Sequence, residues 1–212
     1  MRIFLLLLII FSFNSTAASC ALSKGVGFHV PMDSKGTLCL NNSNYGEELA
    51  KSKGYELTSF TLLSKDVIFF SAGNGIDSYI FMGTPVGIGM QVRESPSDDV
   101  EKNITGINSV TYNKFTNEVF FLTDAWATSA AVHKFDIGPI SEEKKVTPVF
   151  VTSGNSISVV NSGKYVGNII VEKHKYKDGG GSYDPYVLVT PDGKTIKELG
   201  EDQSSVSNAL LK

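Results

Sequence analysis

Three pairs of short apolar segments recur along the chain at a spacing of about 50 residues, and this regularity most constrains the fold. The pairs occupy residues 66–82, 118–135 and 168–189, and their leading segments begin 52 and 50 residues apart. Each pair consists of two runs of β-branched and aromatic residues, separated by a loop and followed by a Gly- or Pro-containing turn. Such runs are typical of β-strands. A period near 50 is typical of propeller blades.

Further strands are expected between these pairs, at residues 109–112, 147–152 and 157–160, and a weaker hairpin joins 26–30 to 37–40. The sequence therefore predicts an all-β fold, a small propeller or propeller-like stack of about four units of about 50 residues. The alternative is a β-sandwich, because hairpins with alternating polarity resemble one another in either architecture. Helices are expected only at 44–53 and 204–211.

The N-terminus has the pattern of a secretory signal peptide. Arg2 precedes an unbroken apolar run at 3–13, and small and polar residues follow at 14–19. The run is shorter than the roughly 20 residues of a transmembrane helix. We therefore expect a signal peptide at 1–19, a single β-repeat domain at 20–212, and an exported protein that is periplasmic or extracellular.

The two cysteines, Cys20 and Cys39, support two incompatible interpretations. In an oxidising compartment they would form a disulfide that closes a loop of about 20 residues. Alternatively, the segment at 17–20 resembles a bacterial lipobox, so that Cys20 would carry a lipid anchor and Cys39 would be left single.

Composition and motifs exclude several functions. The net charge of −3 does not suggest a nucleic-acid-binding protein. The sequence contains no nucleophile elbow, zinc-protease motif, phosphate-binding loop or dinucleotide fingerprint. The spacing of His29, His133 and His174 gives no support for a shared metal site.

The third apolar pair leads into the candidate site. Glu172, His174 and Tyr176 alternate on one face of a strand, either as ordinary polar residues at a strand end or as a ligand or proton-transfer cluster. A loop at 178–184 with three consecutive glycines follows and allows close backbone approach. We expect no cofactor; the alternative is calcium bound by oxygen atoms of Asp178, Ser182 and Asp184, whose spacing matches no EF-hand loop.

The loop at 124–129 contains the only tryptophan and occupies the same place in the second pair that 178–184 has in the third. Trp126 is either a contact residue or a packing plug between units. The corresponding loop of the first pair is 72–77, and we expect all three loops to lie on one face.

The stretch 122–193 resembles a group of exported bacterial proteins of uncharacterised function. The resemblance rests on the segments at 123–129, 154–156, 174–176, 179–184 and 191–194. It implies export and propeller-like β repeats, and no activity.

These patterns favour an exported, non-catalytic binding protein that uses one loop face; an inhibitor or immunity protein for a secreted hydrolase is one version. The partner is a protein or a small ligand. The alternative is a hydrolase that uses Glu172, His174 and Asp184 as acid and base. The expected binding residues are Asp124, Trp126, Glu172, His174, Tyr176, Asp178, Tyr183 and Asp184.

Overall fold

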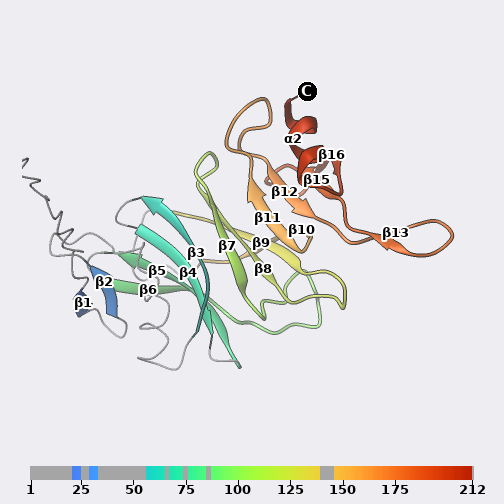
Figure 1. The fold of residues 1–212 in the computed structure, drawn as a ribbon. Coiled ribbons are helices and arrows are strands. Elements are labelled where there is room, and N and C mark those ends of the chain that lie inside the picture. The colour runs from blue at the N-terminus through green and yellow to red at the C-terminus, as the bar shows by residue number, and fades with distance from the viewer. Residues whose placement is uncertain are drawn as a thin grey trace, which may run out of the picture.

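The computed structural model describes residues 21–24, 29–32, 56–64, 67–73, 76–84, 87–138 and 146–211. This part of the chain is all-β, with one helix at its C-terminal end. Its main body consists of three four-stranded antiparallel sheets, formed one after another along the chain (Figure 1). Two further two-stranded sheets accompany them.

The first sheet contains β3 (Glu56–Ser64), β4 (Val67–Gly73), β5 (Ser78–Thr84) and β6 (Gly87–Arg93). The second contains β7 (Asn108–Asn113), β8 (Glu118–Thr123), β9 (Ala131–Asp136) and β10 (Val149–Ser153). The third contains β11 (Ser156–Val159), β12 (Ile169–Glu172), β15 (Tyr186–Val189) and β16 (Thr195–Gly200). The hairpin of β13 (Lys175–Tyr176) and β14 (Ser182–Tyr183) is inserted between β12 and β15. The chain ends in α2 (Gln203–Leu211).

Each predicted strand pair lies at the centre of one sheet. Residues 66–82 contain β4 and β5, residues 118–135 contain β8 and β9, and residues 168–189 contain β12 and β15. The strands expected between the pairs are present as β7, β10 and β11, and the C-terminal helix is present as α2. The all-β prediction is therefore confirmed.

The N-terminal hairpin differs from the prediction. β1 (Ala21–Lys24) pairs with β2 (His29–Met32), so the expected strand at 26–30 has an upstream partner. Gly25 and Gly27 offer a turn signal earlier in the sequence than the one at 31–36. The signal peptide at 1–19, the strand at 37–40, the helix at 44–53, and Cys20 and Cys39 lie outside the described residues.

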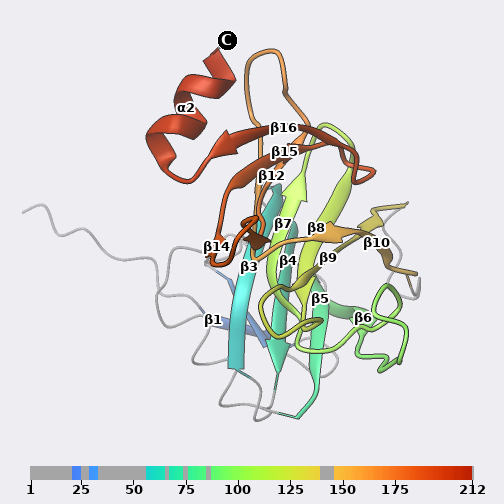
Figure 2. The same cartoon turned by 90° about the vertical axis from the view of Figure 1, so that its right-hand side faces the viewer.

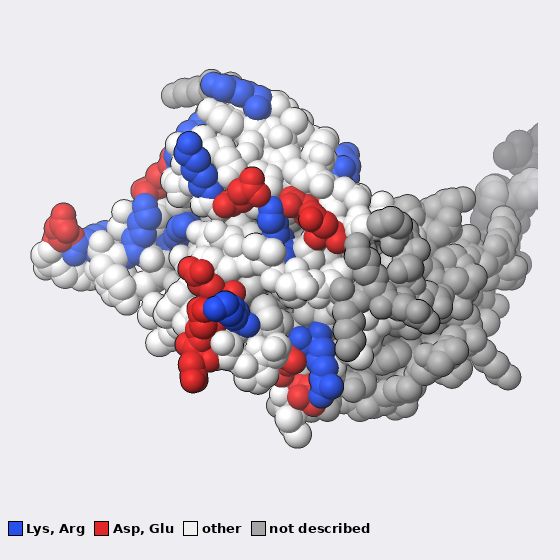
Figure 3. Space-filling view, turned by 180° about the vertical axis from the view of Figure 1, so that it is seen from behind, with Lys and Arg blue, Asp and Glu red and all other residues white. Residues whose placement is uncertain are grey.

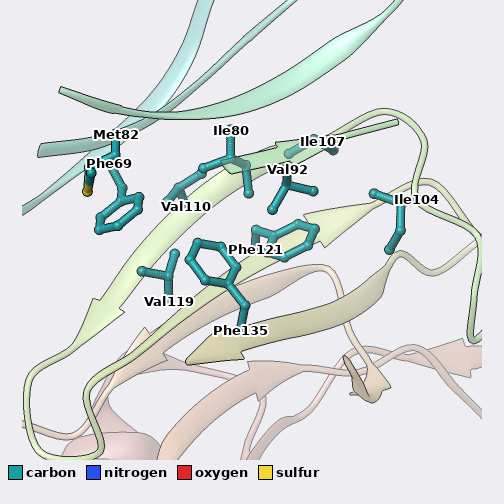
Figure 4. Packing of buried hydrophobic residues seen from close by; sticks show 10 residues of the cluster. All are labelled: Phe69, Ile80, Met82, Val92, Ile104, Ile107, Val110, Val119, Phe121 and Phe135. Atoms are coloured by element: carbon teal, nitrogen blue, oxygen red, sulfur yellow. The ribbon is translucent and has the colours of Figure 1, made fainter. Parts of the chain in front are cut away.

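The second sheet is apolar on both faces because it lies between the other two. From β8, Val119 and Phe121 pack toward the first sheet, against a cluster that includes Phe69 and Ile80 (Figure 4). Phe120, between them in sequence, packs with residues of the third sheet. Side chains alternate between the two faces of a strand, so a strand covered on both faces has an unbroken apolar sequence.

The far face of the third sheet is covered by α2. Ile170, Leu188 and Leu199 from the sheet form a buried cluster with Val206 of the helix. In the described part of the chain, no helix has the length and apolar character to span a membrane.

Polar side chains join β7, the first strand of the second sheet, to both neighbouring sheets. β7 contacts β3 (Figure 2) and, on its other side, β11 (Figure 1). The Ser59 hydroxyl accepts a 2.7 Å hydrogen bond from the Val110 N–H, and the buried Asn113 amide donates one of 2.7 Å to the Gly167 carbonyl. These bonds fix how the sheets sit against each other, and thereby where their connecting loops meet.

Candidate functional site

An open groove of about 660 Å³ lies where the second and third sheets meet. It is lined by residues 126–129 of the loop between β8 and β9, by residues 150–153 of β10, and by His174 and Tyr176. Trp126 is 46% exposed and Tyr176 is 73% exposed. The groove thus presents two large aromatic side chains to solvent, one from the β8–β9 loop and one from β13.

The loop that contains Trp126 is tied down by hydrogen bonds. The Trp126 N–H donates to the Ser129 carbonyl at 2.9 Å. The Asn155 side chain accepts from the Ala130 N–H at 2.9 Å and donates to the Thr128 carbonyl at 3.1 Å. The Asn155 N–H in turn donates to the Glu172 carbonyl at 2.8 Å, which connects the loop to the third sheet. The groove wall is therefore formed before any ligand arrives.

His174 forms a hydrogen bond with Asp184 at the edge of the groove. Its Nδ1 lies 2.7 Å from Oδ1 of Asp184, and the ring meets that of Tyr176 edge-on at 5.0 Å between centroids. A carboxylate only accepts hydrogen bonds, so Nδ1 carries the proton. Nε2 makes no hydrogen bond to any residue that the structure describes. In the neutral ring, Nε2 is consequently a free acceptor.

Two neighbouring charged residues differ in their surroundings. Lys173 is half-buried, and its ammonium group donates to the Thr152 hydroxyl at 2.6 Å. Burial, helped by the nearby charge of Lys175, lowers the pKa of Lys173 below its ordinary value. Glu172 contributes its backbone carbonyl to the loop contact described above.

The glycine-rich loop forms the end of the β13–β14 hairpin, which projects from the body of the molecule (Figure 1). Gly179, Gly180 and Gly181 have φ of 94°, 106° and 85°, which glycine adopts readily because it has no Cβ. Asp178 lies in this turn, whereas the Tyr183 ring lies beside the ammonium groups of Lys175 and Lys177, at 6.0 and 5.6 Å. Asp178 and Tyr183 are therefore not among the groove-lining residues.

Of the three residues considered for calcium, Asp184 is hydrogen-bonded to His174, Ser182 lies opposite Tyr176 in the β13–β14 hairpin, and Asp178 lies in the exposed turn. Among the described residues, no group of three or more His, Cys, Asp or Glu side chains is arranged to hold a metal ion.

Asp124 faces a second hollow, of about 640 Å³, between the first and second sheets. This hollow also includes Asp77 and Glu94. Glu94 accepts hydrogen bonds from the Gly106 N–H at 2.8 Å and from the Ser78 hydroxyl. The loop at 124–129 thus lies between two hollows, and the structure separates Asp124 from His174 and Tyr176.

The sequence did not identify β10 as part of the groove. Phe150, Thr152 and Ser153 line it, and Asn155 anchors its loop. The sequence at 154–156 indicated a turn, but it did not indicate that Asn155 would contact the loop at 124–129. His133, by contrast, is fully buried in the second sheet, and burial lowers its pKa.

Charges on the face seen from behind are interspersed, with acidic and basic side chains close together (Figure 3). No protein-family model matches the chain, and no curated protein matches it.

Proposed function

We propose that the protein is an exported binding protein and that the groove lined by Trp126, His174 and Tyr176 is its binding surface. The observation that carries this proposal is the exposure of Trp126 and Tyr176 on a prearranged wall. Exposed aromatic residues around a concave surface supply much of the binding energy at protein and ligand interfaces. The signal-like N-terminus supports export.

We further propose that the three sheets are the blades of a propeller-like stack. The order of strands within each sheet follows the chain, as it does in blades. In this arrangement the loops between second and third strands belong to equivalent positions, which is why residues 126–129 and the segment after β12 border one groove.

The export proposal is tested by intact-mass spectrometry of the mature protein. We expect processing near residues 18–20 and either a disulfide between Cys20 and Cys39 or a lipid adduct on Cys20. A mature chain that retains residues 1–19 would contradict export by this route.

The binding proposal is tested by affinity capture from the native envelope with three forms of the protein as bait. The wild-type chain should retain material that Trp126→Ala loses, and mass spectrometry and glycan analysis identify it. Phe115→Ala is the matched control, because Phe115 is 44% exposed on the turn between β7 and β8, away from the groove. Equal retention by all three baits would contradict the proposal.

Thermal denaturation of Trp126→Ala distinguishes a contact residue from a packing plug. A side chain that is 46% exposed should cost clearly less than the roughly 3–5 kcal/mol of a buried Trp. Phe121→Ala provides the comparison, since Phe121 is fully buried in the core. We expect a small drop in melting temperature for Trp126→Ala and a large one for Phe121→Ala. Similar large drops would assign Trp126 to packing.

The hydrolase alternative rests on the 2.7 Å contact of His174 with Asp184, which resembles a base and its orienting carboxylate. No hydroxyl or thiol of the described residues is hydrogen-bonded to His174, so a nucleophile would have to be water. His174→Ala should abolish turnover in a hydrolase, whereas in a binding protein it should weaken binding without abolishing it. Hydrolysis assays on envelope polymers with this one variant therefore separate the two functions.

A further inference from the structure

The groove lining carries hydroxyl groups and aromatic rings but no Lys, Arg, Asp or Glu side chain. The hydroxyls come from Thr128 and Ser129 of the loop and from Thr152 and Ser153 of β10. A charged occupant would leave water without gaining a compensating charge from this lining, which is costly. An uncharged occupant rich in hydroxyl groups matches it, because hydroxyls donate and accept at once.

The polar groups of the groove are poised for such an occupant. Lys173 donates a hydrogen bond to the Thr152 hydroxyl oxygen, so the hydroxyl proton remains available as a donor to another group. Asp184 fixes the proton of His174 on Nδ1, which leaves Nε2 of the neutral ring as an acceptor for a ligand O–H. One side of the groove therefore offers a donor and another offers an acceptor, both held by neighbours.

The two rings supply the apolar part of the recognition. Trp126 and Tyr176 lie on separate segments that border the same groove, and both are substantially exposed. The C–H faces of pyranose rings are apolar, whereas their rims carry hydroxyls. An aromatic face beside hydroxyl and imidazole groups complements both parts of a sugar ring.

We propose that the occupant of the groove is a neutral oligosaccharide, bound by Trp126 and Tyr176 through the ring faces and by His174 through a hydroxyl. This inference rests on the proposed binding function and specifies its ligand class. The other occupant that an open groove admits, an extended peptide, is an outcome of the test below.

The protein contains a reporter for this site, because Trp126 is its only tryptophan. Its fluorescence is measured on the full-length mature protein during titration with three neutral trisaccharides, which are cellotriose, maltotriose and tri-N-acetylchitotriose. Trigalacturonic acid serves as the charged comparison. We expect at least one neutral sugar to change the emission with a Kd of about 1 mM or tighter, and the acidic sugar to bind at least about tenfold more weakly.

Groove variants tie the signal to the site. Tyr176→Ala and His174→Ala should each weaken the sugar by about tenfold or more, a loss typical of contact residues. Phe115→Ala should bind as the wild type does. Asp184→Asn removes the carboxylate that fixes the His174 proton and should weaken binding with little effect on folding, because Asp184 is half-exposed. Binding to Trp126→Ala is measured by calorimetry, because this variant has no tryptophan emission.

Failure of this inference is distinguishable from failure of the binding proposal. If no neutral trisaccharide binds, but the wild-type bait still retains a protease-sensitive partner that Trp126→Ala loses, the groove binds protein and the carbohydrate inference is overturned. If neither sugar nor envelope material depends on the groove, both proposals fail. Sugar binding that is unchanged in Tyr176→Ala and His174→Ala also overturns the inference.

Discussion

His133 is the residue whose burial has the clearest consequence for the folded protein. It is fully buried, stacks on Phe121, and bonds through Nε2 to the Glu101 carbonyl and through Nδ1 to the Thr123 hydroxyl. A carbonyl only accepts, so Nε2–H donates to it and Nδ1 accepts from the hydroxyl. The neutral ring satisfies both contacts, and desolvation lowers its pKa below 6.5.

This environment predicts a stability that falls in acid. The unfolded chain takes up a proton near the ordinary pKa of 6.5 and the folded chain does so only at lower pH. The free energy of unfolding should therefore decrease as the pH falls from 8 to 5. Urea denaturation across this range measures it, and His133→Phe should flatten the slope, whereas His174→Gln should retain it. A slope that His133→Phe leaves unchanged would assign the effect to other groups.

Several candidate residues could be recognised from local sequence. Trp126, His174 and Tyr176 are distinctive residues in a loop or at a strand end, and the structure brings them to one groove. The position of Asp124 relative to the groove could not be read from the sequence, because it depends on how the loop at 124–129 packs. Asp124 borders the hollow between the first and second sheets and shares a smaller hollow with Trp126. The role of Thr152 was equally hidden, since it depends on how two sheets pack.

At the scale of elements, the turn between β15 and β16 is determined by a close contact with β10. Gly193 has a φ of 88°, and a Cβ at this position would lie 2.0 Å from the Val151 carbonyl oxygen. Gly180, in the β13–β14 hairpin, has a φ of 106°, and a Cβ there would meet nothing within 4 Å. An alanine would strain the backbone at both positions, but only at Gly193 would its Cβ also clash with another residue.

We expect Gly180→Ala to cost about 1–3 kcal/mol, the usual range for a strained backbone position. Gly193→Ala should cost clearly more, because a backbone atom blocks the added methyl group and the turn must move away from β10. Chemical denaturation of the two variants gives the difference. Equal losses would show that the β15–β16 turn does not rest on β10.

Helix α2 begins at a capping residue. The Asp202 carboxylate accepts from the Ser205 N–H at 2.8 Å and from the hydroxyls of Ser204 and Ser205, and these bonds lower its pKa to about 2. The stabilisation is present above the ordinary pKa of 3.8 and is lost as the pH falls through about 2. Asp202→Ala should increase hydrogen exchange of the α2 amides at neutral pH, with the β12 amides unaffected.

The strands were predictable because their residue types and turn signals are local. The packing of the sheets explains why the apolar runs of β4, β8 and β12 are continuous, because both faces of these strands are covered. The partner of β2 was not predictable, since two turn signals flank it and pairing is decided by the register that the rest of the molecule allows. Closure of the stack into a propeller stays a prediction, because it too depends on how distant parts of the chain pair.

At the scale of the whole molecule, the three sheets depend on one another. The second sheet contributes to two buried clusters, one shared with the first sheet and one shared with the third. Buried hydrogen bonds cross the same boundaries, including that of Asn113 to the Gly167 carbonyl. In stacked units, stability is a sum of intrinsic and interface contributions, and strong interfaces make unfolding cooperative.

We therefore expect the three sheets to unfold in one transition. Emission of Trp126 reports on the second sheet and its boundary with the third, whereas far-ultraviolet circular dichroism reports on all strands, so the two curves should coincide in urea. Asn113→Ala removes a bond across that boundary and leaves the Gly167 carbonyl without this donor, so it should shift both curves to lower urea together. Separated curves in the wild type, or a shift of the Trp126 curve alone, would mean that the boundary opens before the sheets melt, and that the groove there is only as stable as that interface.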